Sequence, residues 1–500
     1  MGYTSAGRSP AEAMLEYHMS HFKEYEQYDA LGLAALIRRR ELSAREVLEA
    51  AIQRIEAENP RINAVVYRCF EQALEALADG VPPGPFGGVP FLLKDLYYHQ
   101  AGLPSSQGSR LFADFVADHD STLVARYRTA GLVILGKTST PEFGLSATTE
   151  PALFGPTRNP WSLQHSAGGS SGGAAAAVAA GCLPMAHATD GGGSIRIPAA
   201  ACGLFGLKPN RARNPVGPDL GEASGGLSAA HCVSRSVRDS AALLDISHGP
   251  EPGDPYSAPP VAGSFLDAVT RPPGNLRIAL LTTALDGAAL DPECVAAVED
   301  AARLCEALGH RVSVAAPAID VAEVAWIWRV ICGVGLWQSL SLRTAALGRA
   351  PREDDVEPVT WRWSLEGRDR SGVEYLGALQ RMHWIGRQLA DFFRQYDLLL
   401  SPVLARPPFP LGTLDMQNPD LDDYYRRLLA ELPITPLFNL TGGPAMSVPL
   451  AWSRAGLPIG IHFGADVGRE ALLFSLAAQL ASARPWFGRR PGTPVSGDST

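Results

Sequence analysis

The stretch that decides the fold runs from residue 168 to residue 209 and reads GGSSGGAAAAVAAGCLPMAHATDGGGSIRIPAAACGLFGLKP. It contains two glycine clusters, with Ser170 in the first and Ser194 in the second. An alanine-rich run (174–180) and an apolar run (183–189) lie between them, which predicts one helix followed by one strand. Both serines are therefore expected in tight turns, next to backbone that carries no side chains.

The first cluster, GGSSGG (168–173), allows three interpretations from the residues alone. A phosphate loop of the Walker A type would need a lysine where Ala174 stands. A dinucleotide fingerprint would need a preceding strand, but the residues before the cluster, NPWSLQHSA, indicate a loop. The remaining interpretation is a flexible turn.

The second cluster, DGGGS (190–194), follows the expected strand. Consecutive backbone N–H groups in such a glycine turn can converge on one point and bind an oxyanion. Ser194 at the end of this turn is placed to attack a carbonyl carbon while these groups stabilise the developing negative charge. The alternative is that Ser194 only caps the following segment.

Lys94 is the third candidate, in the strand-like run VPFLLKDLYY (89–98). A lysine flanked by apolar residues either extends its charged end to the surface or is desolvated. Desolvation favours the neutral amine, which can act as a base. Taken alone, the surface position is the more common outcome for such a lysine.

Short apolar runs alternate with amphipathic segments along the rest of the chain. Strands are expected at 132–137, 277–283, 396–404, 445–450 and 456–463, and helices at 29–80, 120–130, 236–246, 291–309 and 471–483. Ser43, followed three residues later by Glu46, predicts a capping box at a helix start. The alternation predicts an α/β core with a mostly parallel or mixed sheet.

The composition of the 500 residues limits the function classes. Lys and Arg number 43 and Asp and Glu 52, so the net charge is −9, which argues against a nucleic-acid surface. Hydrophobic residues make up 46% and charged residues 19%, so the chain can bury a large core. The sequence shows neither a long apolar run nor a secretory signal pattern. The seven cysteines favour a reducing, cytoplasmic location, and the lack of a CxxC pair among them argues against a zinc ribbon.

Taken together, these features resemble the amidase signature family. The stretch 168–209 is similar to that family's signature, and GVPFLLKD (88–95) resembles its lysine strand. Further similar segments are GKTSTPEFG (136–144), FGPTRNPW (154–161), GGPAMSVPL (442–450) and GLPIGIHF (456–463). The resemblance implies a single large α/β domain with a central mixed β-sheet covered by helices on both faces. We expect an N-terminal helical segment (1–80) packed on the core, a catalytic domain (81–490) and a flexible tail (491–500).

The resemblance also implies roles for individual residues. Ser194 would be the nucleophile, Ser170 the bridging serine, next to a peptide bond that can be cis in this family, and Lys94 the general base. The expected oxyanion hole is the set of backbone N–H groups of Gly191, Gly192, Gly193 and Ser194. Residues expected to support the glycine turn are Ser171, Asp190 and Arg196, although the last two can equally be a plain buried ion pair.

The pocket and the histidines are less specific. Cys332, in the run WIWRVICGVGLW (326–337), is a candidate pocket residue, and its alternative role is that of a small buried hydrophobic side chain. His187 and His231 could serve a Ser–His–Asp triad instead. Neither lies in a recognisable triad context, so structural or surface roles are expected for both.

The activity that the resemblance implies is hydrolysis of a small carboxylic amide through an acyl-enzyme, with no metal and no cofactor. The segments 206–245, 401–412 and 476–491 are most similar to family members that open cyclic amides, but linear amides, lactams, anilides and carbamates remain open. No nucleic acid or membrane partner is expected, and a homodimer is the expectation from the frequency of such assemblies.

Two alternatives are retained. One is the glutaminase-type A subunit of a tRNA-dependent amidotransferase, against which Ile197 argues because a glutamine would be expected there. The other is a non-catalytic binding protein of the same fold, against which the intact Lys94, Ser170 and Ser194 argue.

Overall fold

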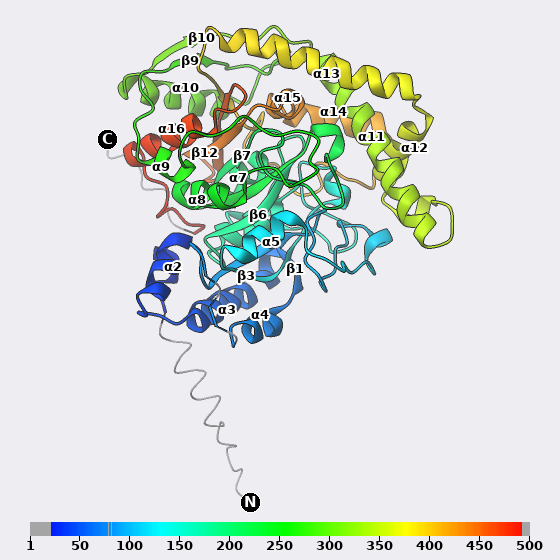
Figure 1. The fold of residues 1–500 in the computed structure, drawn as a ribbon. Helices are drawn as coiled ribbons and strands as arrows, with labels where there is room; N and C mark the ends of the chain where they lie inside the picture. The colour runs from blue at the N-terminus through cyan, green and yellow to red at the C-terminus, as the bar shows by residue number, and fades with distance from the viewer. Residues whose placement is uncertain (1–21, 79, 82, 493–500) are drawn as a thin grey trace, which may run out of the picture.

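An eight-stranded sheet forms the centre of the protein, seen in the upper half of Figure 1. The computed structural model describes residues 22–78, 80–81 and 83–492. The strands of this sheet, in spatial order, are β10 (Arg311–Val314), β9 (Arg277–Leu280), β11 (Leu398–Pro402), β13 (Pro458–Ala465), β12 (Ala445–Trp452), β7 (Phe205–Lys208), β8 (Ala229–Ser234) and β6 (Met185–Asp190). Strands β10, β9 and β11 are parallel and the remaining neighbours are antiparallel. The predicted mixed sheet is therefore confirmed.

Helices cover both faces of this sheet, as the family resemblance implied. The α-helices of the described chain, some of which pack elsewhere, are α2 (Ala30–Arg38), α3 (Ala44–Ile62), α4 (Phe70–Ala76), α5 (Thr122–Thr129), α6 (Gly172–Ala179), α7 (Arg196–Cys202), α8 (Val237–Ser247), α9 (Phe265–Val269), α10 (Pro292–Ala307), α11 (Val321–Ala346), α12 (Pro358–Asp369), α13 (Gly372–Phe393), α14 (Leu421–Glu431), α15 (Thr435–Thr441) and α16 (Glu470–Ala483). The expected helices at 120–130, 236–246, 291–309 and 471–483 thus form, with ends shifted by a few residues.

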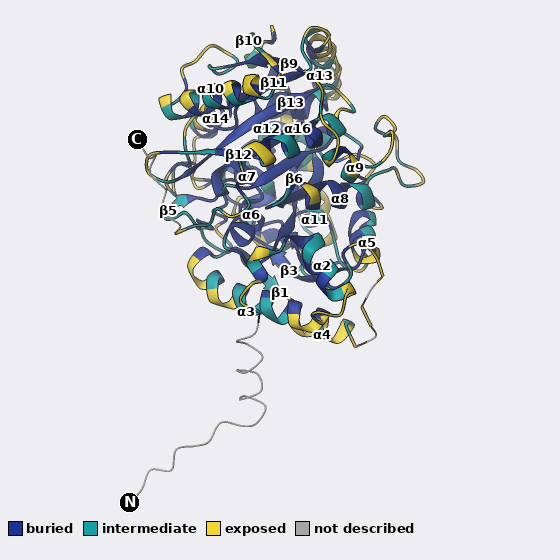
Figure 2. Cartoon of the chain, turned by 90° about the vertical axis from the view of Figure 1, so that its left-hand side faces the viewer, coloured by how far each residue is buried: buried dark blue, intermediate teal, exposed yellow. Residues whose placement is uncertain are grey.

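The two faces of the sheet carry separate hydrophobic cores because neighbouring side chains of a strand point in opposite directions. In β11, Leu398 and Leu400 belong to the core formed with α8, α9, α10 and α16, whereas Leu399 belongs to the core formed with α7, α11, α13 and α15. Figure 2 shows the sheet as the most completely buried layer, with exposed residues on the outer sides of the helices. The sheet is therefore a rigid platform for the loops at its edges.

A second, three-stranded sheet lies in the lower half of Figure 1 and has the order β1 (Val65–Arg68), β3 (Leu132–Thr138) and β2 (Val89–Lys94). The backbone N–H of Lys94, at the end of β2, donates to His187 Nδ1 on β6 at 3.2 Å. This contact places the end of β2 beside the edge strand of the large sheet.

The expectation that 29–80 is helical is wrong for β1. Helix α3 begins with the predicted capping box, in which Ser43 Oγ accepts from the Glu46 N–H and Glu46 accepts from the Ser43 N–H. It ends at Asn63 in a left-handed conformation, and the Asn59 side chain then accepts from the N–H groups of Ala64 and Val65. The β-branched residues that follow pair with β3 instead of continuing the helix.

The domain boundaries near residues 80 and 490 stay a prediction. Most of the predicted flexible tail, 493–500, lies outside the described residues, as do residues 1–21 of the predicted N-terminal segment. In the described part of that segment, Leu33, Val47 and Leu48 belong to one core with Phe91 and Leu135. Across all the described residues, no helix combines the length and the hydrophobicity that a membrane-spanning helix needs.

Candidate active site

The glycine turn between β6 and α7 holds Ser194, and a buried carboxylate organises it. Asp190 is the last residue of β6, and its side chain accepts from the N–H groups of Gly193 (2.7 Å) and Ile195 (3.1 Å). Arg196, the first residue of α7, donates to both oxygens of this carboxylate, each at 2.9 Å. The carboxylate thus compensates the unpaired N–H groups at the start of α7 and fixes the turn.

The charges of this ion pair are balanced deep inside the protein. Both side chains have no exposed surface. Burial raises the pKa of Asp190, but the Arg196 guanidinium overrides this and holds the pKa well below its usual value. Asn439 on α15 donates to the Asp190 side chain at 2.9 Å and accepts from Arg196 at 2.7 Å. The supporting pair is therefore also a buried ion pair, and the two interpretations from the sequence are compatible.

Side chains from helices α11 and α15 donate hydrogen bonds to the carbonyl groups of the glycine turn. Trp328 Nε1 on α11 donates to the carbonyl oxygen of Gly191 at 3.2 Å, and Thr435 Oγ1 on α15 donates to that of Gly192 at 2.8 Å. In a trans peptide the following N–H points the opposite way, so these contacts also orient the N–H groups of Gly192 and Gly193.

The N–H of Gly193 departs from the expected oxyanion hole. It donates to Asp190 Oδ1 at 2.7 Å, because the orientation of the Gly192–Gly193 peptide directs it toward this carboxylate. Within the described chain, no acceptor is bonded to the N–H groups of Gly191, Gly192 and Ser194. Three of the four expected donors are thus available to a bound oxyanion.

Lys94 and Ser170 meet as the resemblance implied. A hydrogen bond of 2.6 Å joins Lys94 Nζ to Ser170 Oγ, and a second of 2.9 Å joins Nζ to Thr189 Oγ1. The peptide bond between Gly169 and Ser170 is cis. The Lys94 side chain is completely buried, and this burial lowers its pKa well below 10.5, although the charge of Asp190 opposes the shift. The desolvated alternative for Lys94 is the one that the structure contains.

Ser194 and Ser170 line one cavity of about 260 Å³, but no hydrogen bond joins their hydroxyl groups in the described structure. Ser194 is 9% exposed and Ser170 is 2% exposed, so the cavity reaches Ser194 more readily. Ser171 holds the two glycine turns together, because its N–H donates to the Ser194 carbonyl oxygen (3.3 Å) and its Oγ donates to the Thr189 carbonyl oxygen (3.1 Å).

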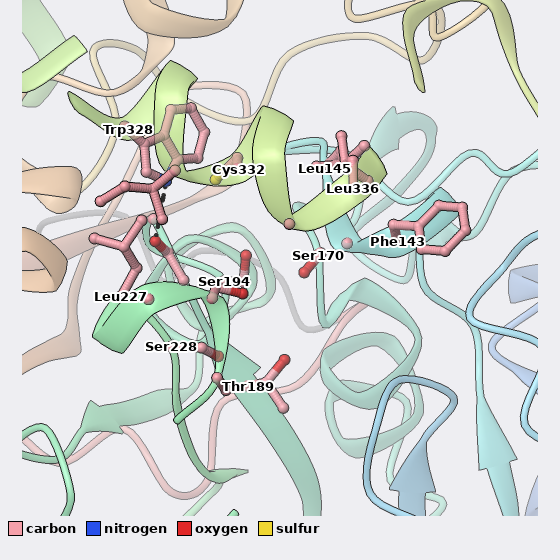
Figure 3. A pocket seen from close by; sticks show the side chains of 18 of the residues that line it. Phe143, Leu145, Ser170, Thr189, Ser194, Leu227, Ser228, Trp328, Cys332 and Leu336 are labelled. Atoms are coloured by element: carbon pink, nitrogen blue, oxygen red, sulfur yellow. Dashed lines mark hydrogen bonds between the residues drawn. The ribbon is translucent and has the colours of Figure 1, made fainter. Parts of the chain in front are cut away.

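Apolar side chains and polar groups share the walls of the cavity. In Figure 3, helix α11 carries Trp328, Cys332 and Leu336 above the two serines, and Phe143 lies farther to the side. Cys332 lines the cavity, and burial raises the pKa of its thiol to about 12, so it remains uncharged. The part of the cavity beside α11 therefore suits an apolar portion of an acyl group.

The two histidines lie away from Ser194. His187 accepts from the Lys94 N–H, and burial lowers its pKa well below 6.5. His231 Nε2 lies 2.8 Å from Ser240 Oγ, and burial lowers its pKa to about 3. Neither lines the cavity, so both occupy the structural positions that we expected.

Several residues of the site had no clear sequence signal. Trp328, Thr435 and Asn439 contact the glycine turn from positions more than 130 residues away in the chain. Thr189 could have been found, because it immediately precedes DGGGS. Within the described ranges, no group of three or more His, Cys, Asp or Glu side chains is arranged to hold a metal ion.

Comparison with known proteins assigns the class of protein. The Amidase family model matches residues 46–474, which is most of the chain. The chain therefore belongs to the amidase family, and it is a hydrolase that acts on amide C–N bonds.

Particular relatives refine this assignment. The 6-aminohexanoate-cyclic-dimer hydrolase of Pseudomonas sp. (strain NK87) is 40% identical over 475 residues, which cover 93% of this chain and 96% of that relative. The acylamidase of Rhodococcus erythropolis is 35% identical over 92% of this chain and 96% of its own. The solved structure of a 6-aminohexanoate cyclic dimer hydrolase complexed with substrate has a TM-score of 0.89 at 39% identity, covering 93% of this chain and 99% of that one. The predicted similarity to cyclic-amide hydrolases is confirmed.

Proposed function

We propose that this amidase uses Lys94, Ser170 and Ser194 as a triad and forms an acyl-enzyme on Ser194. The observation that supports this proposal best is the 2.6 Å contact between Ser170 and a fully buried lysine whose pKa is lowered. A neutral amine in this position has a lone pair that can take the Ser170 proton, while one of its N–H groups donates to Thr189.

The reaction then follows from the groups present. Lys94 takes a proton from Ser170, Ser170 takes one from Ser194, and Ser194 Oγ attacks the amide carbonyl carbon. The free N–H groups of Gly191, Gly192 and Ser194 stabilise the oxyanion, and each such donor contributes about 3 kcal/mol in the transition state. The proton returns through Ser170 to the leaving nitrogen, and water then releases the acyl group by the reverse path. Hydrogen bonds between catalytic groups commonly tighten only when substrate binds, which accommodates the open Ser170–Ser194 contact.

The proposed substrates are apolar amides, linear or cyclic, with anilides, lactams and related carbamates in the same class. The apolar side chains that α11 presents to the cavity around Ser194 support an acyl group with an apolar chain. The relatives include enzymes named for a cyclic amide dimer and for acylamides, and both kinds of substrate fit this class.

A glutaminase function, as in an amidotransferase A subunit, is less well supported. Glutamine carries an α-carboxylate that a binding site normally pairs with a cation. Among the described residues that line the cavity there is no lysine or arginine. The proposed substrate is therefore a small-molecule amide other than glutamine. The proposal also includes a cytoplasmic location, no nucleic acid or membrane partner, and a homodimer as the assembly.

A hydrolysis panel tests the proposal. Wild type should cleave fatty amides, anilides, lactams or urethanes, and the Ser194→Ala variant should fold normally but give no turnover. A control variant, Ser228→Ala, removes a hydroxyl that lines the same cavity without a role in the relay and should keep most activity. Normal hydrolysis by the Ser194→Ala variant would exclude Ser194 as the nucleophile.

A further inference from the structure

The cavity around Ser194 has an uneven charge. Among the described residues that line it, Glu222 is the single ionisable carboxylate, and none is a lysine or an arginine. Glu222 lies on the loop that leads to the short 3₁₀ helix η4 (Ser224–Gly226), and its side chain is exposed. The remaining lining is apolar or carries uncharged polar groups such as Ser228, Gln338 and Tyr375. A charged part of a ligand would therefore meet one negative charge and no positive one.

The guanidinium of Arg211, which lies near Glu222, is bonded to other acceptors. A Cβ placed on Gly226 would lie 2.6 Å from Glu222 Oε1 and 3.0 Å from Arg211 Nε, so the two groups lie near each other. Burial lowers the pKa of Arg211, and the charge of Glu222 opposes this shift. The Arg211 guanidinium nevertheless donates to the carbonyl oxygens of Gly226 (2.6 Å), Asn439 (2.9 Å) and Leu440 (2.6 Å). Arg211 does not line the cavity of Ser194. Glu222 also lines a smaller neighbouring hollow together with Arg211, whose charge weakens the field of Glu222. In the described structure the Glu222 carboxylate forms no hydrogen bond within the protein and no ion pair, so it can still meet a ligand at the rim of the Ser194 cavity.

Tyr375 closes the same part of the cavity from α13. Its hydroxyl would lie 3.2 Å from a Cβ placed on Gly225, so α13 approaches the Glu222 loop closely at this glycine. Burial raises the pKa of Tyr375, and the charge of Glu222 raises it further. Tyr375 therefore stays protonated and presents a neutral donor and acceptor beside the carboxylate.

We propose that Glu222 is a specificity-determining residue, which selects amides that carry a protonated amine away from the scissile bond and disfavours those that carry a carboxylate. This inference rests on the proposed amidase function of the same cavity. The apolar wall would hold a methylene chain, and Glu222 would pair with an ammonium group at its end. Because Glu222 is exposed, the gain is modest, about threefold in kcat/KM, as is usual for solvated ion pairs.

Three matched substrates test the inference. They are the 4-nitroanilides of hexanoic acid, 6-aminohexanoic acid and adipic acid, which share one chain length and end in a methyl, an ammonium and a carboxylate group. Wild type should prefer the ammonium substrate to the neutral one and the neutral one to the anionic one. The Glu222→Gln variant should lose both differences, so that the ratios of kcat/KM among the three substrates approach one. High salt should also reduce the preference of wild type, because ions screen exposed charges.

The controls separate the two proposals. Glu306→Gln removes an exposed carboxylate on α10 that does not line the cavity, and it should keep the wild-type order. Calorimetric binding of the same three compounds to the Ser194→Ala variant, with and without Glu222→Gln, measures the preference without turnover. An unchanged order after Glu222→Gln in hydrolysis and in binding would overturn the role of Glu222. Absence of hydrolysis of the neutral substrate by wild type would count against the proposed function instead.

Discussion

Replacement of Lys208 by methionine should change how the stability of this protein depends on pH. Lys208 ends β7, is 1% exposed, and its Nζ donates to the Pro209 carbonyl oxygen at 2.8 Å. The pKa of Lys208 is lowered from 10.5 to about 7, chiefly by burial and also by the charge of Arg196, while the charge of Asp190 opposes the shift. Three of the four lysines in the sequence are buried. Lys94 belongs to the proposed mechanism and Lys137 forms an ion pair with Asp95. Lys208 has neither role, since its amine donates only to a backbone carbonyl group in the described structure.

The sign and size of the effect follow from this pKa. Between pH 7 and pH 10.5 the unfolded chain holds a proton on Lys208 that the folded protein has lost, so stability rises with pH in this window. One pH unit corresponds to about 1.4 kcal/mol, and Lys208 is half protonated in the folded protein near pH 7. Wild type should therefore gain about 2 kcal/mol from this residue between about pH 7 and 9. Methionine has a similar length and no titrating group, so the variant lacks this gain.

Urea unfolding at pH 7 and pH 9, followed by fluorescence and by circular dichroism, measures the effect. The stability of the Lys208→Met variant relative to wild type should fall by about 2 kcal/mol between the two pH values. Lys23→Met, at an exposed lysine, is the matched control and should show no such change. A difference between Lys208→Met and wild type that is the same at both pH values would refute the reasoning.

Other expected outcomes concern the site itself. Lys94→Ala and Ser170→Ala should each lower kcat by several orders of magnitude, and the double variant should be little worse than either, because the two groups act as one unit. Since the neutral form of Lys94 is the base, kcat/KM should rise with pH and level off well below pH 10.5; a rate that falls as pH rises through neutrality would contradict this. Asp190→Asn should cost about 3 to 5 kcal/mol of stability in urea unfolding, because it leaves the Arg196 charge buried without its partner. EDTA should leave turnover unchanged, and inactivation by it would point to a different mechanism.

The local patterns of the sequence predicted much of the site. Two glycine clusters around serines, separated by a helix and a strand, already place Ser170 and Ser194 in tight turns. The capping box at Ser43 and the apolar runs of β3, β9 and β11 were equally readable, because their signals lie within a few neighbouring residues. The incorrect prediction of a helix throughout 29–80 has the opposite cause. Strand β1, which follows the end of α3 at Asn63, forms by pairing with β3, and that partner strand lies far along the chain.

The polar support of the glycine turn shows where local patterns end. Nothing near Trp328, Thr435 or Asn439 marks them as partners of residues 190–192, because each contact is made only when α11 and α15 pack against the turn. The hydrogen bond from the Gly193 N–H to Asp190 is a second example. The sequence predicts four candidate N–H donors for the oxyanion hole. The direction of each peptide in the folded protein decides that only three of them lack an acceptor within the described chain.

The order of residues along the chain was therefore enough to identify the chemical groups, the α/β class and the family, because glycine turns, strand runs and caps are short-range features. Whether Lys94 is charged or neutral required the assembled protein. Its pKa depends on how completely other segments exclude water from the amine, and in the folded chain that exclusion is complete. The same holds for Glu222, the one carboxylate among the described residues that line the cavity, since the balance of charges in a pocket is set by which distant side chains face it.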